Sequence, residues 1–179
     1  MSWSRWTEAL RGALAALVLC GLAAAAQAEE APACAQFKWP LAAERSWFEA
    51  GKLKELQSGA SVGEAADGAF DLALKPSTEV SFALPPEGKP KPGKPLGAVL
   101  TFAAVAMPGT YQVTLSDEAW IDIVQDGAYR PSLEFSGVHG CPGLRKSVRF
   151  DFKQAPLVLQ LSSASVPSLK LAIRRLPSP

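Results

Sequence analysis

The sequence predicts a mainly β protein, an antiparallel β-sandwich or barrel with one short N-terminal helix. Apolar and polar residues alternate from residue 68 onward, which is typical of strands with one face on a core and one in water. Proline, glycine, serine and aspartate separate these runs, and no helical pattern lies between them, as parallel strands would require. The eight expected strands lie at residues 69–74, 80–84, 98–105, 111–115, 120–124, 148–152, 157–161 and 169–173.

The expected helix covers roughly residues 40–50. Pro40 would occupy its first position and Gly51 would follow its end, as is common at helix termini. Leu41 and Phe48 would share one face of this helix.

Two segments are expected to be loops. Residues 57–67 are small and polar. Residues 85–95 alternate proline and lysine, which predicts an exposed, extended connector. A basic docking arm for an acidic or proline-recognising partner is the alternative for this second loop.

The N-terminus has the order of a cleavable secretory signal peptide. Arg5 and Arg11 precede an uncharged apolar run at residues 13–26, and an Ala-x-Ala triplet follows, ending at Ala28. The run is shorter than the roughly 20 residues that a membrane-spanning helix needs. We therefore expect a periplasmic or secreted protein without membrane insertion after cleavage. The expected organisation is a signal peptide at residues 1–28 and a single β-sandwich domain at residues 29–179.

Loss of the signal peptide would leave a domain without net charge. It would remove two of the 18 basic and one of the 17 acidic residues of the chain. A neutral domain has no general electrostatic attraction for nucleic acid or anionic lipid, so we expect neither as a partner.

Cysteine content agrees with export. Cleavage would remove Cys20 and leave Cys34 and Cys141, and an even number of cysteines in an exported chain favours a disulfide. Two separate thiols, one of them reactive, are the alternative. A disulfide would leave Cys141 without the thiolate that a nucleophilic pair with His139 needs.

The second half of the domain holds most of the chemically versatile residues. Three glycines and a proline surround His139, the only histidine of the chain. A serine triad could be drawn from Ser136 or Ser147 with His139 and Asp122, although no nucleophile-elbow motif accompanies them.

The single histidine also bears on metal binding. Zinc and non-haem iron sites usually take two or three histidines, so we expect neither a metal nor a cofactor. An oxygen-only calcium site stays open, although EF-hand spacing is absent. Its candidate ligands are Asp117, Glu118, Asp122 and Asp126.

Several aromatic residues fit either a core or a platform for a sugar or another flat ligand. Strand spacing favours the core, because a sandwich of this size needs large apolar side chains. These residues are Trp39, Trp47, Tyr111, Trp120 and Tyr129.

Two resemblances follow from these segments. The strand rhythm of residues 108–115, 147–150 and 156–161 resembles bacterial secreted jelly-roll modules of the pre-peptidase C-terminal type. The likeness covers roughly residues 97–174. It implies a jelly-roll-like β-sandwich that binds, shields or assists rather than catalyses.

The second resemblance covers nearly the whole domain. Residues 34–40, 120–127 and 139–148 resemble a family of small exported bacterial proteins of unassigned function, some of which carry the name homogentisate 1,2-dioxygenase. That name implies an iron enzyme with two histidines and a glutamate on the metal. With one histidine in this chain, no iron-ligand position carries over.

The resulting expectation is a non-enzymatic periplasmic or secreted binding or accessory domain, with a small ligand or an envelope protein as its partner. The alternative is an enzyme, either the dioxygenase that the family name implies or a hydrolase using Ser136 and His139. The candidate binding surface consists of Asp122, Gln125, Asp126, Ser136, His139, Arg145 and Lys146.

Overall fold

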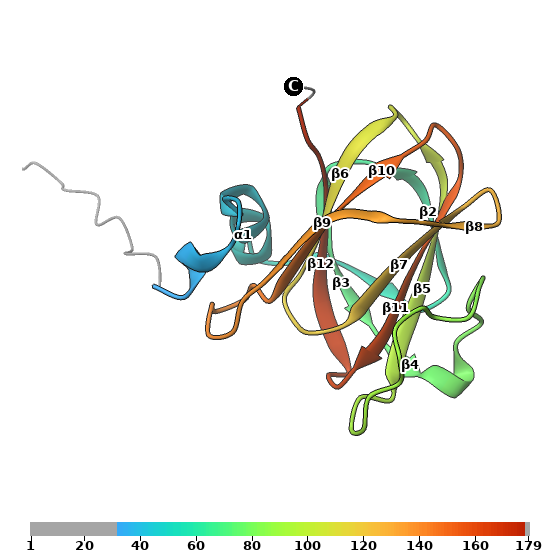
Figure 1. The fold of residues 1–179 in the computed structure, drawn as a ribbon, viewed down its shortest axis with the longest axis horizontal. Coiled ribbons are helices and arrows are strands. Elements are labelled where there is room, and N and C mark those ends of the chain that lie inside the picture. The colour runs from blue at the N-terminus through green and yellow to red at the C-terminus, as the bar shows by residue number, and fades with distance from the viewer. Residues whose placement is uncertain (1–31, 178–179) are drawn as a thin grey trace, which may run out of the picture.

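The computed structural model describes residues 32–177, which form a β-sandwich of two sheets with one α-helix beside it (Figure 1). The predicted signal peptide lies outside the described residues. In spatial order, sheet A contains β1 (Lys54–Gln57), β3 (Gly68–Ala73), β12 (Ser168–Arg175), β6 (Gly109–Leu115), β10 (Lys146–Phe152) and β9 (Ser132–Gly137). Sheet B contains β2 (Ala60–Ala65), β5 (Leu96–Val105), β11 (Leu157–Ala164), β7 (Trp120–Gln125) and β8 (Ala128–Arg130), with β4 (Lys75–Pro76) beside β5. The helical elements are η1 (Cys34–Gln36), α1 (Ala42–Glu49) and η2 (Ser77–Glu79).

The core lies between the two sheets, as twofold alternation requires. Tyr111, Val113 and Leu115 of β6 point into it, and the rings of Tyr111 and Phe152 stack with centroids 4.6 Å apart. The mainly β sandwich with one short helix near the N-terminal end is therefore confirmed, and seven of the eight predicted strands are present.

The predicted strand at residues 80–84 is wrong. This segment lies across the outer face of sheet B without pairing in either sheet. The backbone N–H groups of Ala83 and Leu84 instead donate to the buried side-chain oxygen of Gln160, at 2.6 and 3.1 Å. A buried glutamine thus satisfies backbone groups that a neighbouring strand would otherwise bind.

The predicted loop at residues 57–67 is also wrong, because it contains β2 and the end of β1. The chain passes from sheet A to sheet B at Ser58 and Gly59, where Gly59 has φ +95°. Strand β1 pairs in parallel with β3, and β2 pairs in parallel with β5. The sequence predicts antiparallel strands, and these two pairs are exceptions. Parallel strands need a crossover connection, and between β1 and β3 the chain crosses through β2 in the opposite sheet instead of through a helix.

The segment that contains η1 and α1, which we call the N-terminal segment, covers the outer face of sheet A (Figure 1). The predicted helix is present as α1, beginning at Ala42. The predicted disulfide is present between Cys34 and Cys141, with an S–S distance of 2.07 Å. Beside it, Trp39 is buried and its indole Nε1 donates to Ser147 Oγ at 3.2 Å. The segment is thus attached to β10 by this hydrogen bond and to the loop before β10 by the disulfide.

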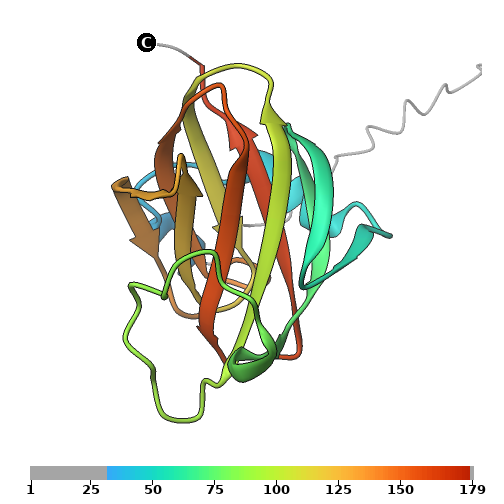
Figure 2. The ribbon, with the colours of Figure 1, turned by 90° about the vertical axis from the view of Figure 1, so that its right-hand side faces the viewer.

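The proline- and lysine-rich loop lies along the outer side of sheet B and reaches beyond it (Figure 2). Most of residues 85–95 are exposed, yet the loop is anchored at several points. The Glu87 N–H donates to Asp122 Oδ2 at 3.2 Å, and Ser163 Oγ donates to the Lys89 carbonyl at 3.2 Å. Gly88 lies directly against the Trp120 ring, where a Cβ would be 2.4 Å from Cγ.

None of the helices described for residues 32–177 could span a membrane.

Candidate functional site

A pocket opens along one side of the sandwich, between the start of β7 in sheet B and β9 in sheet A. Strand β8 has three residues and pairs only with the second half of β7, so Trp120 and Ile121 have no strand beside them on that side. Across the gap lies β9, the edge strand of sheet A. The space between them has a volume of about 330 Å³, and we call it the Trp120 pocket. Its lining includes Trp120, Ile121, Phe135, His139, Lys146 and Val148.

Two large aromatic side chains flank the pocket and remain exposed. Phe135 is 62% exposed and Trp120 is 40% exposed, whereas Trp39 and Tyr111 are buried as expected of core residues. The prediction that Trp120 belongs to the core is therefore wrong. Its position at the first residue of β7, beyond the end of β8, leaves it at the edge of sheet B. Exposed aromatic groups around a concave site are typical of a binding surface.

Lys146 supplies a positive charge inside the pocket. Its ammonium donates to the Ala119 carbonyl at 3.0 Å and lies 5.1 Å from the centroid of the Trp120 ring. Burial lowers the pKa of Lys146 below its usual value, because a charged amine loses water contacts there, and the Glu118 carboxylate only partly opposes this effect. Lys146 forms no ion pair with any carboxylate of the described residues.

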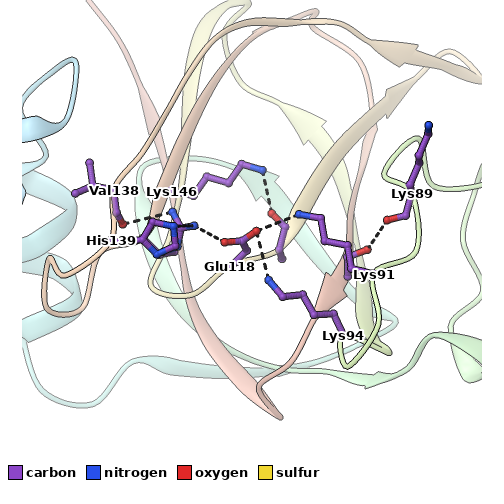
Figure 3. Close-up of polar contacts among 10 residues, drawn as sticks. Lys89, Lys91, Lys94, Glu118, Val138, His139 and Lys146 are labelled. Atoms are coloured by element: carbon purple, nitrogen blue, oxygen red, sulfur yellow. Dashed lines mark hydrogen bonds and ion pairs between the residues drawn. The ribbon is translucent and has the colours of Figure 1, made fainter.

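Glu118 binds three cationic side chains at the border of the pocket (Figure 3). One carboxylate oxygen pairs with Lys91 at 3.1 Å and Lys94 at 3.4 Å, and the other accepts a short hydrogen bond from Arg145. Burial raises the pKa of Glu118, but the Lys91 hydrogen bond and the charges of Arg145 and Lys94 outweigh it and lower the pKa to about 2. Glu118 therefore stays ionised and connects the proline- and lysine-rich loop to the start of β10.

Arg145 is held by three acceptors. Besides Glu118, it donates to the Val138 carbonyl at 3.4 Å and contacts His139 Nε2 at 3.0 Å. A guanidinium can only donate, so His139 Nε2 is the acceptor in this contact. These contacts fix the guanidinium beside the pocket.

Asp122 fixes the Trp120 side chain by a hydrogen bond but does not itself line the pocket. Its Oδ1 accepts the indole Nε1–H of Trp120 at 2.6 Å, and its Oδ2 accepts the Glu87 N–H. Burial raises the pKa of Asp122, although both hydrogen bonds favour the ionised form. The side chain thus positions Trp120 and the adjacent loop.

No protein-family model, curated protein or solved structure matches the chain. The function must therefore be inferred from the chemistry of the pocket.

The seven residues of the predicted binding surface divide into separate places. His139, Arg145 and Lys146 line the Trp120 pocket, and Asp122 lies behind its aromatic wall. Gln125 and Asp126 lie at the other end of β7, where Gln125 binds the backbone of Lys153 and Asp126 pairs with its ammonium at 2.9 Å.

Ser136 faces the N-terminal segment, where its buried Oγ accepts the Lys38 N–H at 3.0 Å. Ser147 is likewise buried, and its Oγ contacts Trp39 and Thr114. Neither serine lines the pocket that His139 lines, so neither forms the predicted pair with His139 there. Within residues 32–177, no group of three or more histidine, cysteine, aspartate or glutamate side chains is placed to hold a metal.

Sequence reasoning missed Glu118 and Phe135 as residues of the pocket. Glu118 was weighed only as a calcium ligand, and its cationic partners come from the loop and from β10. For Phe135 a signal was present, because Leu133 and Phe135 alternate with polar residues and predict a strand face.

Acid should weaken the ion pairs of Glu118 with Lys91, Lys94 and Arg145. Because the folded-state pKa of Glu118 lies below its ordinary 4.5, its contribution to stability is present above about pH 4.5 and is lost as the pH falls toward 2. After allowance for solvent screening we expect a loss of about 1–2 kcal/mol. Urea unfolding of the wild type and Glu118→Gln at pH 6 and pH 3 measures it. The variant should lose less stability over this interval, and equal losses would contradict the assignment.

Proposed function

We propose that the protein is an exported, non-enzymatic binding domain that holds a small ligand in the Trp120 pocket. The observation that carries this proposal is the exposure of Trp120 and Phe135 on two sides of a cavity of about 330 Å³. Pockets for small molecules are concave, mainly apolar and supplied with a few polar groups. Lys146 is such a group here, since it lies among Ile121 and Val148.

The compartment in this proposal is the periplasm or the extracellular space. Support comes from the Cys34–Cys141 disulfide, because such bonds persist mainly in oxidising environments. The signal peptide expected at residues 1–28 points the same way.

Binding is favoured over catalysis by the state of the reactive groups. Cys141 is in a disulfide, both serines considered as nucleophiles are bonded elsewhere, and His139 is engaged by Arg145. A general base needs a nucleophile within hydrogen-bond reach, and no such pair is formed by the described residues that line the pocket.

Nuclear magnetic resonance tests the proposal directly. The indole Nε1–H resonance of Trp120 is assigned with Trp120→Phe, and a library of small molecules is added to the ¹⁵N-labelled protein. Binding should shift the resonances of Trp120 and of the Phe135 and Gly137 backbone amides, because these residues line the pocket. The indole of Trp47 on α1 should not move, since it packs with the N-terminal segment.

A variant pair makes this test specific. Phe135→Ala should weaken ligand binding at least about fivefold, because an exposed aromatic wall is removed. Leu133→Ala is the matched control, since Leu133 is similarly exposed on the same strand but does not line the pocket. A library without any compound that shifts the pocket resonances, or equal effects of the two variants, would refute the proposal.

A further inference from the structure

The charges around the Trp120 pocket are unbalanced. Lys91, Lys94 and Arg145 gather around the Glu118 carboxylate, and Lys146 lies near it without forming an ion pair. Asp122 lies near Lys146 and Glu87 lies near Asp122, so four cationic side chains stand against three carboxylates. A concave site with excess positive charge and low-dielectric walls concentrates anions.

Arg145 and Lys146 are the two cations of this group that line the pocket, and Lys146 is the one that remains available to a ligand. Arg145 is already bonded to Glu118, His139 and the Val138 carbonyl. The Lys146 ammonium has three donors, and its one hydrogen bond to a described residue goes to the Ala119 carbonyl. The remaining donors belong to a half-buried charge without a carboxylate partner among the described residues, and an anion in the pocket would supply one.

Gly137 makes room for the Arg145 guanidinium beside the pocket, because a Cβ at this position would lie 3.2 Å from Arg145 Nη1. Gly137 pairs with Lys146 across β9 and β10, so the two residues lie side by side on the same face of sheet A. Two residues away along the same two strands, Phe135 pairs with Val148 and supplies the adjacent apolar wall of the pocket. The polar and apolar parts of the pocket are therefore arranged side by side.

The volume limits the size of the occupant. A space of about 330 Å³ is at the lower end of the range for small-molecule sites, which suits a body of one or two rings or a short alkyl chain. Ile121, Phe135 and Val148 present carbon atoms to that body. A strongly hydrated ligand such as a simple sugar acid would leave these surfaces without an apolar partner.

We propose that the ligand of the Trp120 pocket is a small organic anion with a compact apolar body. Its carboxylate binds the Lys146 ammonium, and its apolar body lies against Phe135, Ile121 and Val148. This inference rests on the proposed binding function and adds the chemical class of the ligand. Aromatic and aliphatic acids share this chemistry, and the experiment distinguishes them.

Four compounds added to the ¹⁵N-labelled protein test the inference. These probes are 2-naphthoate, its uncharged analogue 2-naphthamide, octanoate and galacturonate. The naphthoate or the octanoate should shift the Trp120 indole and Gly137 amide resonances. Tighter binding of naphthoate would identify the ligand as an aromatic acid, and tighter binding of octanoate would identify it as an aliphatic acid. Naphthamide should bind at least about tenfold more weakly than naphthoate if the aromatic acid is the ligand, because it lacks the charge-assisted hydrogen bond.

Variants at Lys146 assign the effect to this side chain. Lys146→Met should weaken binding of the acid about tenfold or more, whereas Lys146→Arg should retain most of it. Lys54→Met is the matched control, because Lys54 lies exposed on β1 at the opposite edge of sheet A. A retained melting temperature of Lys146→Met shows that any loss of binding does not come from unfolding.

The outcomes separate the two proposals. Equal binding of naphthamide and naphthoate at the pocket, or no loss in Lys146→Met, overturns the anion inference and leaves the binding domain standing. Stronger binding of galacturonate than of either apolar acid also overturns it. If neither these four probes nor the small-molecule library shift any pocket resonance, both proposals fail.

Discussion

Replacing Cys34 and Cys141 together by serine should lower the free energy of unfolding by about 3 kcal/mol. The disulfide closes a loop of 107 residues. Chain-entropy reasoning gives about 4–5 kcal/mol for a loop of this length, and native disulfides usually contribute about 2–5 kcal/mol. A loss of this size is a large part of the stability of a small domain.

The loss has a structural location as well as a magnitude. The disulfide joins η1 to the segment between β9 and β10, and beside it Phe37, Trp39 and Leu41 pack against Val138 and Leu144. Without the covalent bond, this cluster must hold the N-terminal segment on sheet A by packing alone. Hydrogen exchange of the Lys38 amide, which donates to Ser136 Oγ, should therefore accelerate more than exchange in the central strand β6.

Urea unfolding of the double variant measures the change in free energy. Reduction of the wild-type disulfide provides the control and should give a similar loss without any substitution. An unchanged unfolding midpoint in both experiments would show that the packing of the N-terminal segment, and not the bond, holds it in place.

The central strands could be predicted from sequence because their two faces meet different surroundings, and apolar and polar residues alternate accordingly. In β6, Tyr111, Val113 and Leu115 face the core, while Gln112 and Thr114 face the N-terminal segment. Even the buried residues on the outer face are polar, so the twofold pattern survives. Local pattern and tertiary environment agree in such strands.

The edges of the sandwich could not be predicted in this way. Strand β2 contains small residues and a glycine, Gly63, and it pairs in parallel with β5 after the chain changes sheets. Its core contacts are few, since Ala65 is its one fully buried residue. The segment at residues 80–84 shows the reverse error, because its alternation is clear and its partner is the Gln160 side chain.

The pocket was found from sequence only in part, for a related reason. The region around His139, Arg145 and Lys146 stood out because its residue types are unusual. Trp120 could not be recognised as exposed from sequence. It is exposed because β8, the strand next to β7, is too short to reach it. That is a property of strand pairing, and residue alternation in β7 carries no information about it.

Replacing Glu44 by alanine is the second substitution for which we expect a large effect. Glu44 of α1 is fully buried on the outer face of sheet A. Its Oε1 accepts hydrogen bonds from Gln112 Nε2 and Arg174 Nε, both at 2.6 Å. Gln112 is itself fully buried and accepts from Arg149 Nε at 3.2 Å, so the carboxylate is the centre of a connected polar group.

Glu44→Ala should lower the free energy of unfolding by about 3 kcal/mol, because it leaves a buried amide and a guanidinium without their acceptor. Arg174 is 24% exposed and regains some water, which places the expected loss at the lower end of the range for a broken buried pair. Glu44→Gln should cost less, since an amide oxygen can still accept from one of the two donors.

Urea unfolding of these variants beside Glu49→Ala provides the measurement. Glu49 lies on the same helix and is exposed, so its replacement should change stability by no more than about 0.5 kcal/mol. The double variant Glu44→Ala/Arg174→Ala should be more stable than the sum of the two single losses predicts, because removing both partners leaves no unpaired charge. Strictly additive losses would show that the ion pair with Arg174 does not stabilise the domain.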